Sequence, residues 1–276
     1  MCAEATDRPA TDSTLFAVVR SVPGGATDAA ARVQRRTPLT LVHGFAQNSG
    51  CLGPLADALA ADHPTTLVDA PGHGRSKDHS TVDLTRGAAL LSATMPTGAL
   101  IGYSMGGRLA LRTALDHPDK VTSLVLIGAT PGIDDAGERE TRRLSDHRLA
   151  ERLEAVGLER FLDEWLALPM FAGLAPWARF DEQRRVNDAR ALADSLRHAG
   201  TGSMTPLWDR LGEIDVPVLC ITGSRDGRYC ETARRMVALI GPHAEHRVIA
   251  DAGHSAHLEA PQATIQLVDE FLRHRG

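Results

Sequence analysis

The sequence lacks the features that define several large classes of protein. Its N-terminal stretch, MCAEATDRPATDST, contains no apolar segment of the kind that secretory signals carry. No uninterrupted apolar run reaches the roughly 18 residues that a membrane-spanning helix needs. Cysteine is scarce, with 4 in 276 residues, and the spacing is that of neither a metal site nor a disulfide framework. These absences predict a cytoplasmic protein with reduced thiols, no membrane span and no bound metal.

The chain also has no large excess of charge of one sign. Lys and Arg number 30 and Asp and Glu 35, which gives a net charge of −5. This mild acidity argues against nucleic acid as the main partner, although a local basic patch could still hold an anion. A chain of 276 residues is long enough to bury a core without disulfides or metals. The sequence does not report the oligomeric state, and a monomer is the expectation.

Short apolar runs alternate with amphipathic stretches along most of the chain. Strands are expected at 15–19, 37–44, 65–68, 98–103, 121–127, 216–222 and 245–249, and helices at 51–61, 84–94, 106–116, 232–240 and 261–273. Strands that alternate with helices indicate βαβ units and a mostly parallel sheet. We therefore expect an α/β fold with helices beside the sheet.

The segment 134–210 breaks this alternation. It is rich in Arg and Glu, has a helical period and contains no convincing strand. It is predicted to be a helical cap inserted between two strands of a core made of residues 13–133 and 211–276. Residues 1–12 are expected to be loose.

The strongest local motif is GYSMG at 102–106, a G-x-S-x-G pattern between an expected strand and an expected helix. With 25 glycines in the chain such a pattern can arise by chance. The strand before it and the helix after it favour a nucleophile elbow, in which a strained turn exposes the serine hydroxyl. Ser104 is therefore the candidate nucleophile or base.

A serine hydroxyl reacts only when a histidine accepts its proton. In an elbow fold the partners follow in the order serine, acid, histidine, each after a strand. Asp226 follows the strand VPVLCIT and His254 follows the strand HRVIA, so these two are the candidates. Asp215 and Asp251 fit the acid role less well. His257 is a solvated neighbour or a supporting residue.

An earlier strand ends in His43-Gly44-Phe45-Ala46. In elbow enzymes an amide from this loop and the amide after the serine form an oxyanion hole. The expected donors are the backbone N–H groups of Phe45 and Met105. His43 is expected to support the loop rather than take part in the chemistry.

These matches occur in the right order, and on them the chain resembles the α/β-hydrolase superfamily over about residues 37–273. The resemblance implies a mostly parallel sheet with helices on both faces and an inserted helical cap. The loop DAPGHGRS at 69–76 is similar to the PGHG-S turn of that superfamily, and we expect its role to be structural. The superfamily performs many reactions, so the elbow does not name a substrate.

Further residues resemble one family of that superfamily, the 2-succinyl-6-hydroxy-2,4-cyclohexadiene-1-carboxylate synthases of menaquinone biosynthesis. They are the elbow followed directly by Arg108, the PG-I turn at 131–133 followed by paired arginines and SD, and the LW segment at Trp208. The resemblance implies a lyase that removes pyruvate from 2-succinyl-5-enolpyruvyl-6-hydroxy-3-cyclohexene-1-carboxylate. In such a lyase the serine, activated by the histidine, removes a proton α to the succinyl carbonyl. Neither an acyl-enzyme nor a cofactor is then required.

A small substrate with three carboxylates implies an arginine-rich pocket, because a guanidinium can grip a carboxylate with two bonds. The resemblance suggests five substrate-binding residues: Arg108, Arg142, Arg184, Tyr103 and Trp165. The basic pair at 184–185 leaves the register open by one residue. The mixed-charge cap helix could equally be a solvated face. Cys51-Leu52 stands where the family often has tryptophan, which could alter one pocket wall.

Two other functions use the same residues. A carboxylesterase or thioesterase needs the same triad but predicts a neutral or apolar acyl pocket. A non-catalytic ligand receptor on this fold usually tolerates loss of a triad member, whereas all three candidates are present here.

Overall fold

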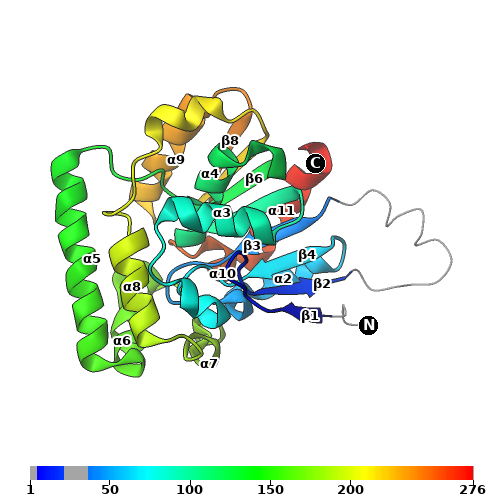
Figure 1. Ribbon diagram of the computed structural model, residues 1–276. Coiled ribbons are helices and arrows are strands. Elements are labelled where there is room, and N and C mark those ends of the chain that lie inside the picture. The colour runs from blue at the N-terminus through cyan, green and yellow to red at the C-terminus, as the bar shows by residue number, and fades with distance from the viewer. Residues whose placement is uncertain (1–4, 22–36, 276) are drawn as a thin grey trace.

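The computed structural model describes residues 5–21 and 37–275, in which eight strands form one sheet of order β1-β2-β4-β3-β5-β6-β7-β8 (Figure 1). The strands are β1 (Ala5–Arg8), β2 (Ala17–Arg20), β3 (Leu39–Val42), β4 (Thr65–Val68), β5 (Gly98–Tyr103), β6 (Val121–Ile127), β7 (Val218–Gly223) and β8 (Ala244–Ile249). From β4 to β8 all neighbours are parallel, and β1 and β2 are antiparallel additions at one edge. The prediction of a mostly parallel sheet is confirmed.

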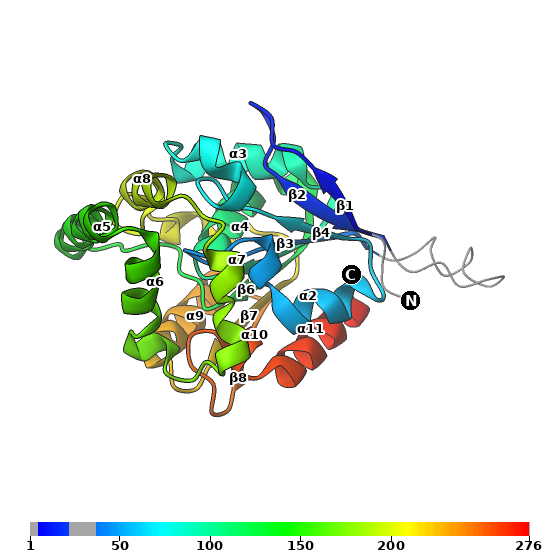
Figure 2. The same ribbon diagram turned by 90° about the horizontal axis from the view of Figure 1, so that it is seen from below.

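Helices bury both faces of this sheet. They are α2 (Gly53–Ala60), α3 (Leu84–Thr94), α4 (Met105–Asp116), α9 (Gly227–Ile240), α10 (Ala256–Glu259) and α11 (Pro261–Arg275). Successive residues of a strand point to opposite faces, so Leu100 packs with α3 and α4 while Ile101 packs with α2 and α11. In Figure 2, α3 lies on one side of the strands and α2 and α11 on the other. Because both faces are covered, the central strands consist of fully buried residues.

A group of helices separates β6 from β7 in the chain and lies at the left of Figure 1. It consists of α5 (Ala136–Val156), α6 (Leu158–Leu166), α7 (Asp181–Arg184) and α8 (Ala189–Ala199). Of these, α5, α6 and α8 share a small apolar core that includes Leu153, Phe161 and Leu192. Ala46 and Phe45, from the loop after β3, belong to the same cluster. The insertion therefore rests on the loop that carries the expected oxyanion donor.

Three local expectations need correction. Residues 5–8, expected to be loose, form the edge strand β1, because their backbone pairs with β2 and Asp7 forms an ion pair with Arg75 at 2.6 Å. Residues 1–4 lie outside the described part of the chain. The helix expected at 232–240 begins earlier, at Gly227, directly after Asp226. The helix expected at 51–61 is a 3-10 turn, Ser49–Cys51, followed by α2.

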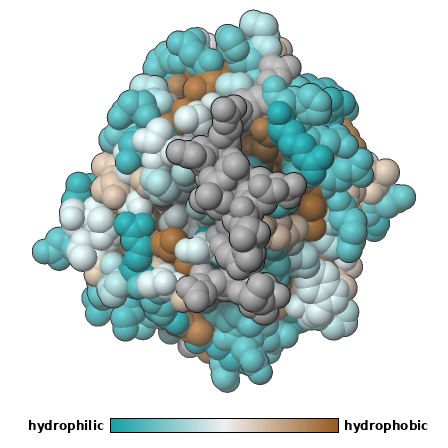
Figure 3. Space-filling model, turned by 90° about the vertical axis from the view of Figure 1, so that its right-hand side faces the viewer, coloured by the Kyte–Doolittle hydropathy of each residue, from teal (hydrophilic) through white to brown (hydrophobic). Residues whose placement is uncertain are grey.

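The face opposite the inserted helices is shown in Figure 3. Outside the grey atoms, hydrophilic residues predominate there and the hydrophobic ones form separate small patches. Within residues 5–21 and 37–275, no helix combines the length and the apolar character needed to cross a bilayer. The large concave feature of the molecule lies elsewhere, between the inserted helices and the carboxyl ends of the strands.

Candidate active site

Ser104 lies at a strained turn between β5 and α4. Its φ is +51° and its ψ −108°, a conformation that residues with a side chain rarely adopt. The glycines around it are required by close packing: a Cβ on Gly106 would collide with the carbonyl oxygen of Val42, and a Cβ on Gly102 with that of Gly106. The turn thus has the geometry of a nucleophile elbow, with Ser104 at the N-terminus of α4.

The structure brings the three predicted triad residues together. Nε2 of His254 lies 2.9 Å from Oγ of Ser104, and Nδ1 of His254 lies 2.7 Å from Oδ2 of Asp226. The carboxylate can only accept, so Nδ1 carries a proton and Nε2 is left to accept the proton of Ser104. The His254 side chain is only 3% exposed and that of Asp226 15%, so bulk water does not compete for these bonds. Neither Asp215 nor Asp251 pairs with the His254 ring.

The loop after β3 runs beside the start of α4, as the contact between Gly106 and Val42 shows. The backbone amides of Phe45 and Met105, the predicted oxyanion donors, lie on these two segments. In the described chain neither amide has a hydrogen-bond acceptor. Two free amides beside the Ser104 hydroxyl can therefore stabilise an oxyanion.

Buried side chains fix the conformation of this loop. Gln47 Oε1 accepts the amide of Gly44 at 2.9 Å, and Nδ1 of His43 donates to the Gly44 carbonyl at 2.8 Å. Nε2 of His43 accepts the amide of Ala70 at 3.0 Å. Burial lowers the pKa of His43 to about 4, so the ring is neutral at pH 7 and acts as a structural support.

The neighbouring PGHG-S loop has a structural role as well. Asp69 accepts the amides of Ser49 and Arg75 at 2.7 and 2.8 Å, and Ser76 Oγ accepts the amide of Phe16 at 2.8 Å. These bonds join the loop to the segments on either side of it.

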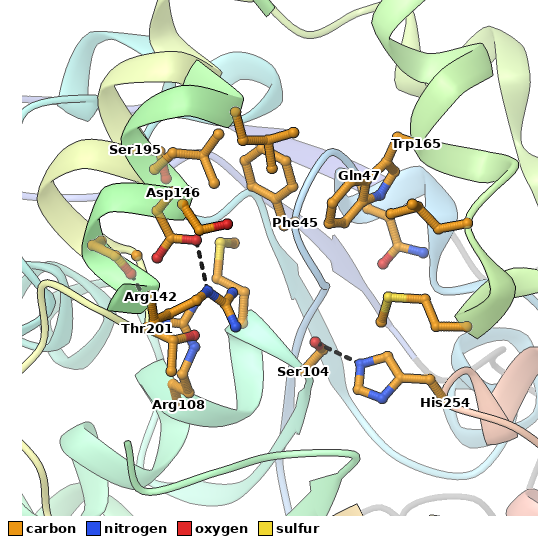
Figure 4. Close-up of a pocket in the computed structure, with 18 of the residues that line it drawn as sticks. Phe45, Gln47, Ser104, Arg108, Arg142, Asp146, Trp165, Ser195, Thr201 and His254 are labelled. Atoms are coloured by element: carbon orange, nitrogen blue, oxygen red, sulfur yellow. Dashed lines mark hydrogen bonds and ion pairs between the residues drawn. The ribbon is translucent and has the colours of Figure 1, made fainter. Parts of the chain in front are cut away.

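A cavity of about 700 Å³ opens above Ser104 and His254 and reaches the inserted helices (Figure 4). Its apolar wall includes Phe45, Trp165, Leu168, Met170 and Phe171. Six arginines also line it: Arg108, Arg142, Arg148, Arg152, Arg184 and Arg228. The carboxylates in its lining are those of Asp146 and Asp226. The cavity lining therefore combines several cationic side chains with aromatic and aliphatic ones.

Two of these arginines are buried and have no ion-pair partner among the described residues. Arg108, which is 7% exposed, donates through Nη1 to the carbonyl of Ala199 at 2.8 Å. Burial lowers its pKa to about 10, so it keeps its charge at pH 7. Arg184, 1% exposed, donates to the carbonyls of Arg179 and Ala46 at 2.6 and 3.0 Å. Burial lowers its pKa also.

The bond to Ala46 links Arg184 to the loop that carries Phe45. Ala46 has a φ of +56°, so the loop needs such support. Arg185 is half exposed and lies 3.9 Å from Glu159, outside the cavity. The geometry therefore places Arg184, not its neighbour, at the site.

The other cavity arginines differ in how their charge is balanced. Arg142 binds Asp146 at 2.7 Å, as Figure 4 shows, and Arg152 binds Glu164. Arg148 and Arg228 are exposed and form no ion pair in the described chain. No motif distinguishes these two arginines in the sequence, because their places at the cavity depend on how the fold positions α5 and α9.

The two aromatic candidates lie in the cavity wall. The hydroxyl of Tyr103 is bound to Ser255 Oγ at 2.6 Å, so only its ring is available to a ligand. Trp165 packs edge-on against Phe45, with ring centroids 5.3 Å apart. Its Nε1 is buried and has no hydrogen-bond partner in the described structure.

The structure also places three neighbouring residues. Cys51 and Leu52 are buried in the core and do not line the cavity. Of the two roles considered for His257, the solvated one is wrong: the ring is fully buried against that of Tyr103, with centroids 4.3 Å apart, where it can support the site. Within residues 5–21 and 37–275 no cluster of His, Cys, Asp or Glu is arranged to hold a metal ion.

Known proteins share both the sequence pattern and the fold. The profile of the alpha/beta hydrolase family matches residues 41–267. The chain belongs to this family. The predicted α/β-hydrolase fold is confirmed by that match and by the observed sheet.

Curated relatives carry the name that the sequence motifs suggested. The 2-succinyl-6-hydroxy-2,4-cyclohexadiene-1-carboxylate synthase of Klebsiella pneumoniae subsp. pneumoniae is 31% identical over 85% of this chain and 93% of its own. The synthase of Enterobacter sp. (strain 638) is 30% identical over 86% of this chain and 92% of its own. A Bacillus subtilis (strain 168) protein, provisionally named for the same synthase, is 35% identical over 84% of this chain and 88% of its own.

Comparison with solved structures points to the same relatives. MenH from S. aureus superposes with a TM-score of 0.80 at 27% identity, covering 94% of this chain and 98% of that one. An esterase from Thermogutta terrifontis reaches 0.76 at 22% identity, which shows the shared fold alone. The chain therefore resembles the synthases within the alpha/beta hydrolase family, as its motifs predicted.

Proposed function

We propose that this protein is a carbon–oxygen lyase that eliminates pyruvate from 2-succinyl-5-enolpyruvyl-6-hydroxy-3-cyclohexene-1-carboxylate, a step of menaquinone biosynthesis. The relatives named for this synthase support the proposal. The observation that carries it is the pair of buried arginines, Arg108 and Arg184, next to the Ser104–His254 pair.

A buried guanidinium without a carboxylate partner is costly, because burial removes its hydration and nothing of opposite charge replaces it. The lowered pKa of Arg108 reflects this cost. A site keeps such a cation when the ligand supplies the missing anion. Arg148 and Arg228, at the rim, add two more unpaired cations. A ligand with several carboxylates balances this cavity, whereas a neutral ester does not.

In the proposed chemistry, the side chains of the triad carry out all the proton transfers. His254 Nε2 accepts the proton of Ser104, and the Ser104 oxygen takes a proton from the carbon α to the succinyl carbonyl. Negative charge then develops on that carbonyl oxygen, where the amides of Phe45 and Met105 stabilise it. The electron pair moves through the ring and breaks the bond to the enolpyruvyl oxygen. The departing group receives a proton, by way of His254, and tautomerises to pyruvate, so no bond forms between Ser104 and the substrate.

In this proposal the three carboxylates are held by Arg108, Arg184 and Arg142. Arg108 approaches from the first turn of α4, directly above Ser104, while the other two come from the inserted helices. Arg142 shares its charge with Asp146 and is expected to bind least tightly. Trp165 and the ring of Tyr103 pack against the carbon skeleton of the substrate.

The surroundings of the reaction follow from the same proposal. The proposed substrate is a small anion, so the protein needs neither nucleic acid nor a membrane as a partner. The proposed chemistry requires no cofactor. Three described cysteines, Cys51, Cys220 and Cys230, are free thiols, as is usual for the cytoplasm. A monomer remains our expectation.

A carboxylesterase or thioesterase is the second candidate, because the aromatic wall of Phe45, Trp165 and Phe171 could accept an acyl chain. The test is to add purified protein to the enolpyruvyl substrate and to 4-nitrophenyl esters in parallel. We expect pyruvate to appear far faster than in the protein-free control. We expect any cleavage of the 4-nitrophenyl esters to proceed without a burst. Pyruvate release at the spontaneous rate would reject the lyase. The Ser104→Ala variant controls for release that does not depend on the elbow.

A further inference from the structure

Both backbone amides that flank His254 are held by one carboxylate. The amide of Gly253 donates to Oε2 of Glu259 at 2.8 Å, and the amide of Ser255 donates to Oε1 at 3.1 Å. Glu259 ends the short helix α10, five residues after His254. Its two oxygens therefore fix the backbone on each side of the ring that must face Ser104.

This restraint adds to the packing of the His254 ring against Tyr229 and Tyr103, whose ring centroids lie 4.5 and 5.5 Å away. The polar contacts of its ring are those with Asp226 and Ser104, the partners it serves in the reaction. Gly128 closes one side, since a Cβ there would lie 3.1 Å from Cε1 of His254. A rotation of the 253–255 backbone would change the 2.9 Å separation from Ser104 directly.

The same carboxylate touches the inserted helical segment. Gly173 follows the 3-10 turn Pro169–Phe171, whose residues Met170 and Phe171 line the cavity. A Cβ on Gly173 would collide with Oε2 of Glu259. Because both amides hold the carboxylate in place, it cannot move aside without losing a hydrogen bond. The cavity wall at 169–173 and the His254 loop therefore meet at Glu259.

We propose that Glu259 is a positioning residue for His254 and that the segment at Gly173 acts on His254 through it. The inference rests on the proposed triad but not on the identity of the substrate. Its physical basis is that a displacement of about 1 Å between reacting groups can lower a rate by about 10²-fold.

A purely structural role for Glu259 is also conceivable, since its bond to the Ser255 amide caps α10. The two roles predict different results. A cap affects stability alone, whereas a positioning residue affects the reactivity of Ser104 at temperatures where the protein is fully folded.

The experiment compares Glu259→Gln and Glu259→Met with the unmodified protein. Glutamine keeps one acceptor oxygen, and methionine keeps the size but no oxygen acceptor. The readouts are kcat and KM for pyruvate release, the thermal midpoint, and the rate at which diethyl 4-nitrophenyl phosphate modifies Ser104. That reagent reports the Ser104–His254 alignment whatever the natural substrate is, so it separates failure of this inference from failure of the proposed lyase.

We expect Glu259→Met to lower both kcat and the Ser104 modification rate by about 10- to 100-fold, with KM little changed. Glu259→Gln should recover part of both rates. Gly173→Ala should lower the same two rates. Gly212→Ala should not, because its added Cβ would lie an ordinary 3.7 Å from the carbonyl oxygen of Leu239. Unchanged Ser104 modification in folded Glu259→Met would overturn the inference, as would equal rates in Gly173→Ala and Gly212→Ala.

Discussion

Replacing Arg108 with methionine separates what this residue does for the ligand from what it does for the fold. Methionine fills similar space but carries no charge and no donor. Arg108 is buried, donates to the Ala199 carbonyl and has no ion-pair partner in the described chain. The substitution therefore removes a cation that has no anionic partner in the protein and that the proposed substrate would supply with one.

The substitution changes the free energy of substrate binding and the free energy of unfolding by different amounts. A hydrogen bond to a charged group contributes about 1.5–3 kcal/mol. With a factor of ten per 1.4 kcal/mol, its loss lowers kcat/KM by about 10- to 150-fold. In the free protein, the fall of the Arg108 pKa from 12.5 to about 10 corresponds to a cost on the order of 3 kcal/mol for keeping the charge buried. Losing the charged bond to Ala199 offsets about 1.5–3 kcal/mol of that gain. We expect a thermal midpoint that is unchanged or higher.

The assay couples pyruvate to lactate dehydrogenase for kcat and KM, and scanning calorimetry gives the thermal midpoint. Arg86→Met, at an exposed arginine outside the cavity lining, is the control and should keep both values. Full activity in Arg108→Met would refute the reasoning about the ligand. A clear loss of stability would refute the reasoning about the unpaired buried charge.

Three further outcomes follow from the site. Ser104→Ala should abolish most turnover while calorimetric substrate binding stays nearly intact; equal loss of binding would contradict its role as base. Asp226→Asn should lower kcat by about 10⁴-fold, because an amide no longer holds His254 in the tautomer whose Nε2 accepts the Ser104 proton, with KM little affected; normal kcat would refute that role. Burial lowers the pKa of His257 to about 3, so the unfolded chain binds more protons below pH 6.5 and stability falls as the solution is acidified. His257→Leu, which loses no hydrogen bond, should flatten the fall of the thermal midpoint between pH 6.5 and 4; an unchanged slope would contradict this.

The elbow and the positions of the central strands along the chain could be predicted because their signals are local. A G-x-S-x-G motif between a buried strand and a helix requires the packing that Gly102 and Gly106 show. The edge strand β1 was missed because its four residues are exposed and have no apolar alternation; only pairing with β2 defines it. The position of Asp226 after a strand made it a candidate for the acid. That its carboxylate faces His254 could be seen only in the folded structure.

The sequence alone could not show which charged side chains of the site are paired with an opposite charge. Arg142 and Arg184 look alike in the chain, yet one meets Asp146 and the other meets only carbonyl oxygens. Glu259 was missed since an acidic residue after a histidine loop has no distinctive spacing. Such differences depend on which atoms the fold brings within 3 or 4 Å, and a pattern of residue types does not contain that information.

A single-turnover experiment tests the central claim most directly. Excess protein is mixed with the enolpyruvyl substrate, and pyruvate, the cyclohexadiene product and the intact mass of the protein are followed together. Elimination through Ser104 as a base predicts equal amounts of the two products, formed at the same rate, with no change in protein mass at any time. A transient mass increase on Ser104, or product formation no faster than in buffer, would contradict it.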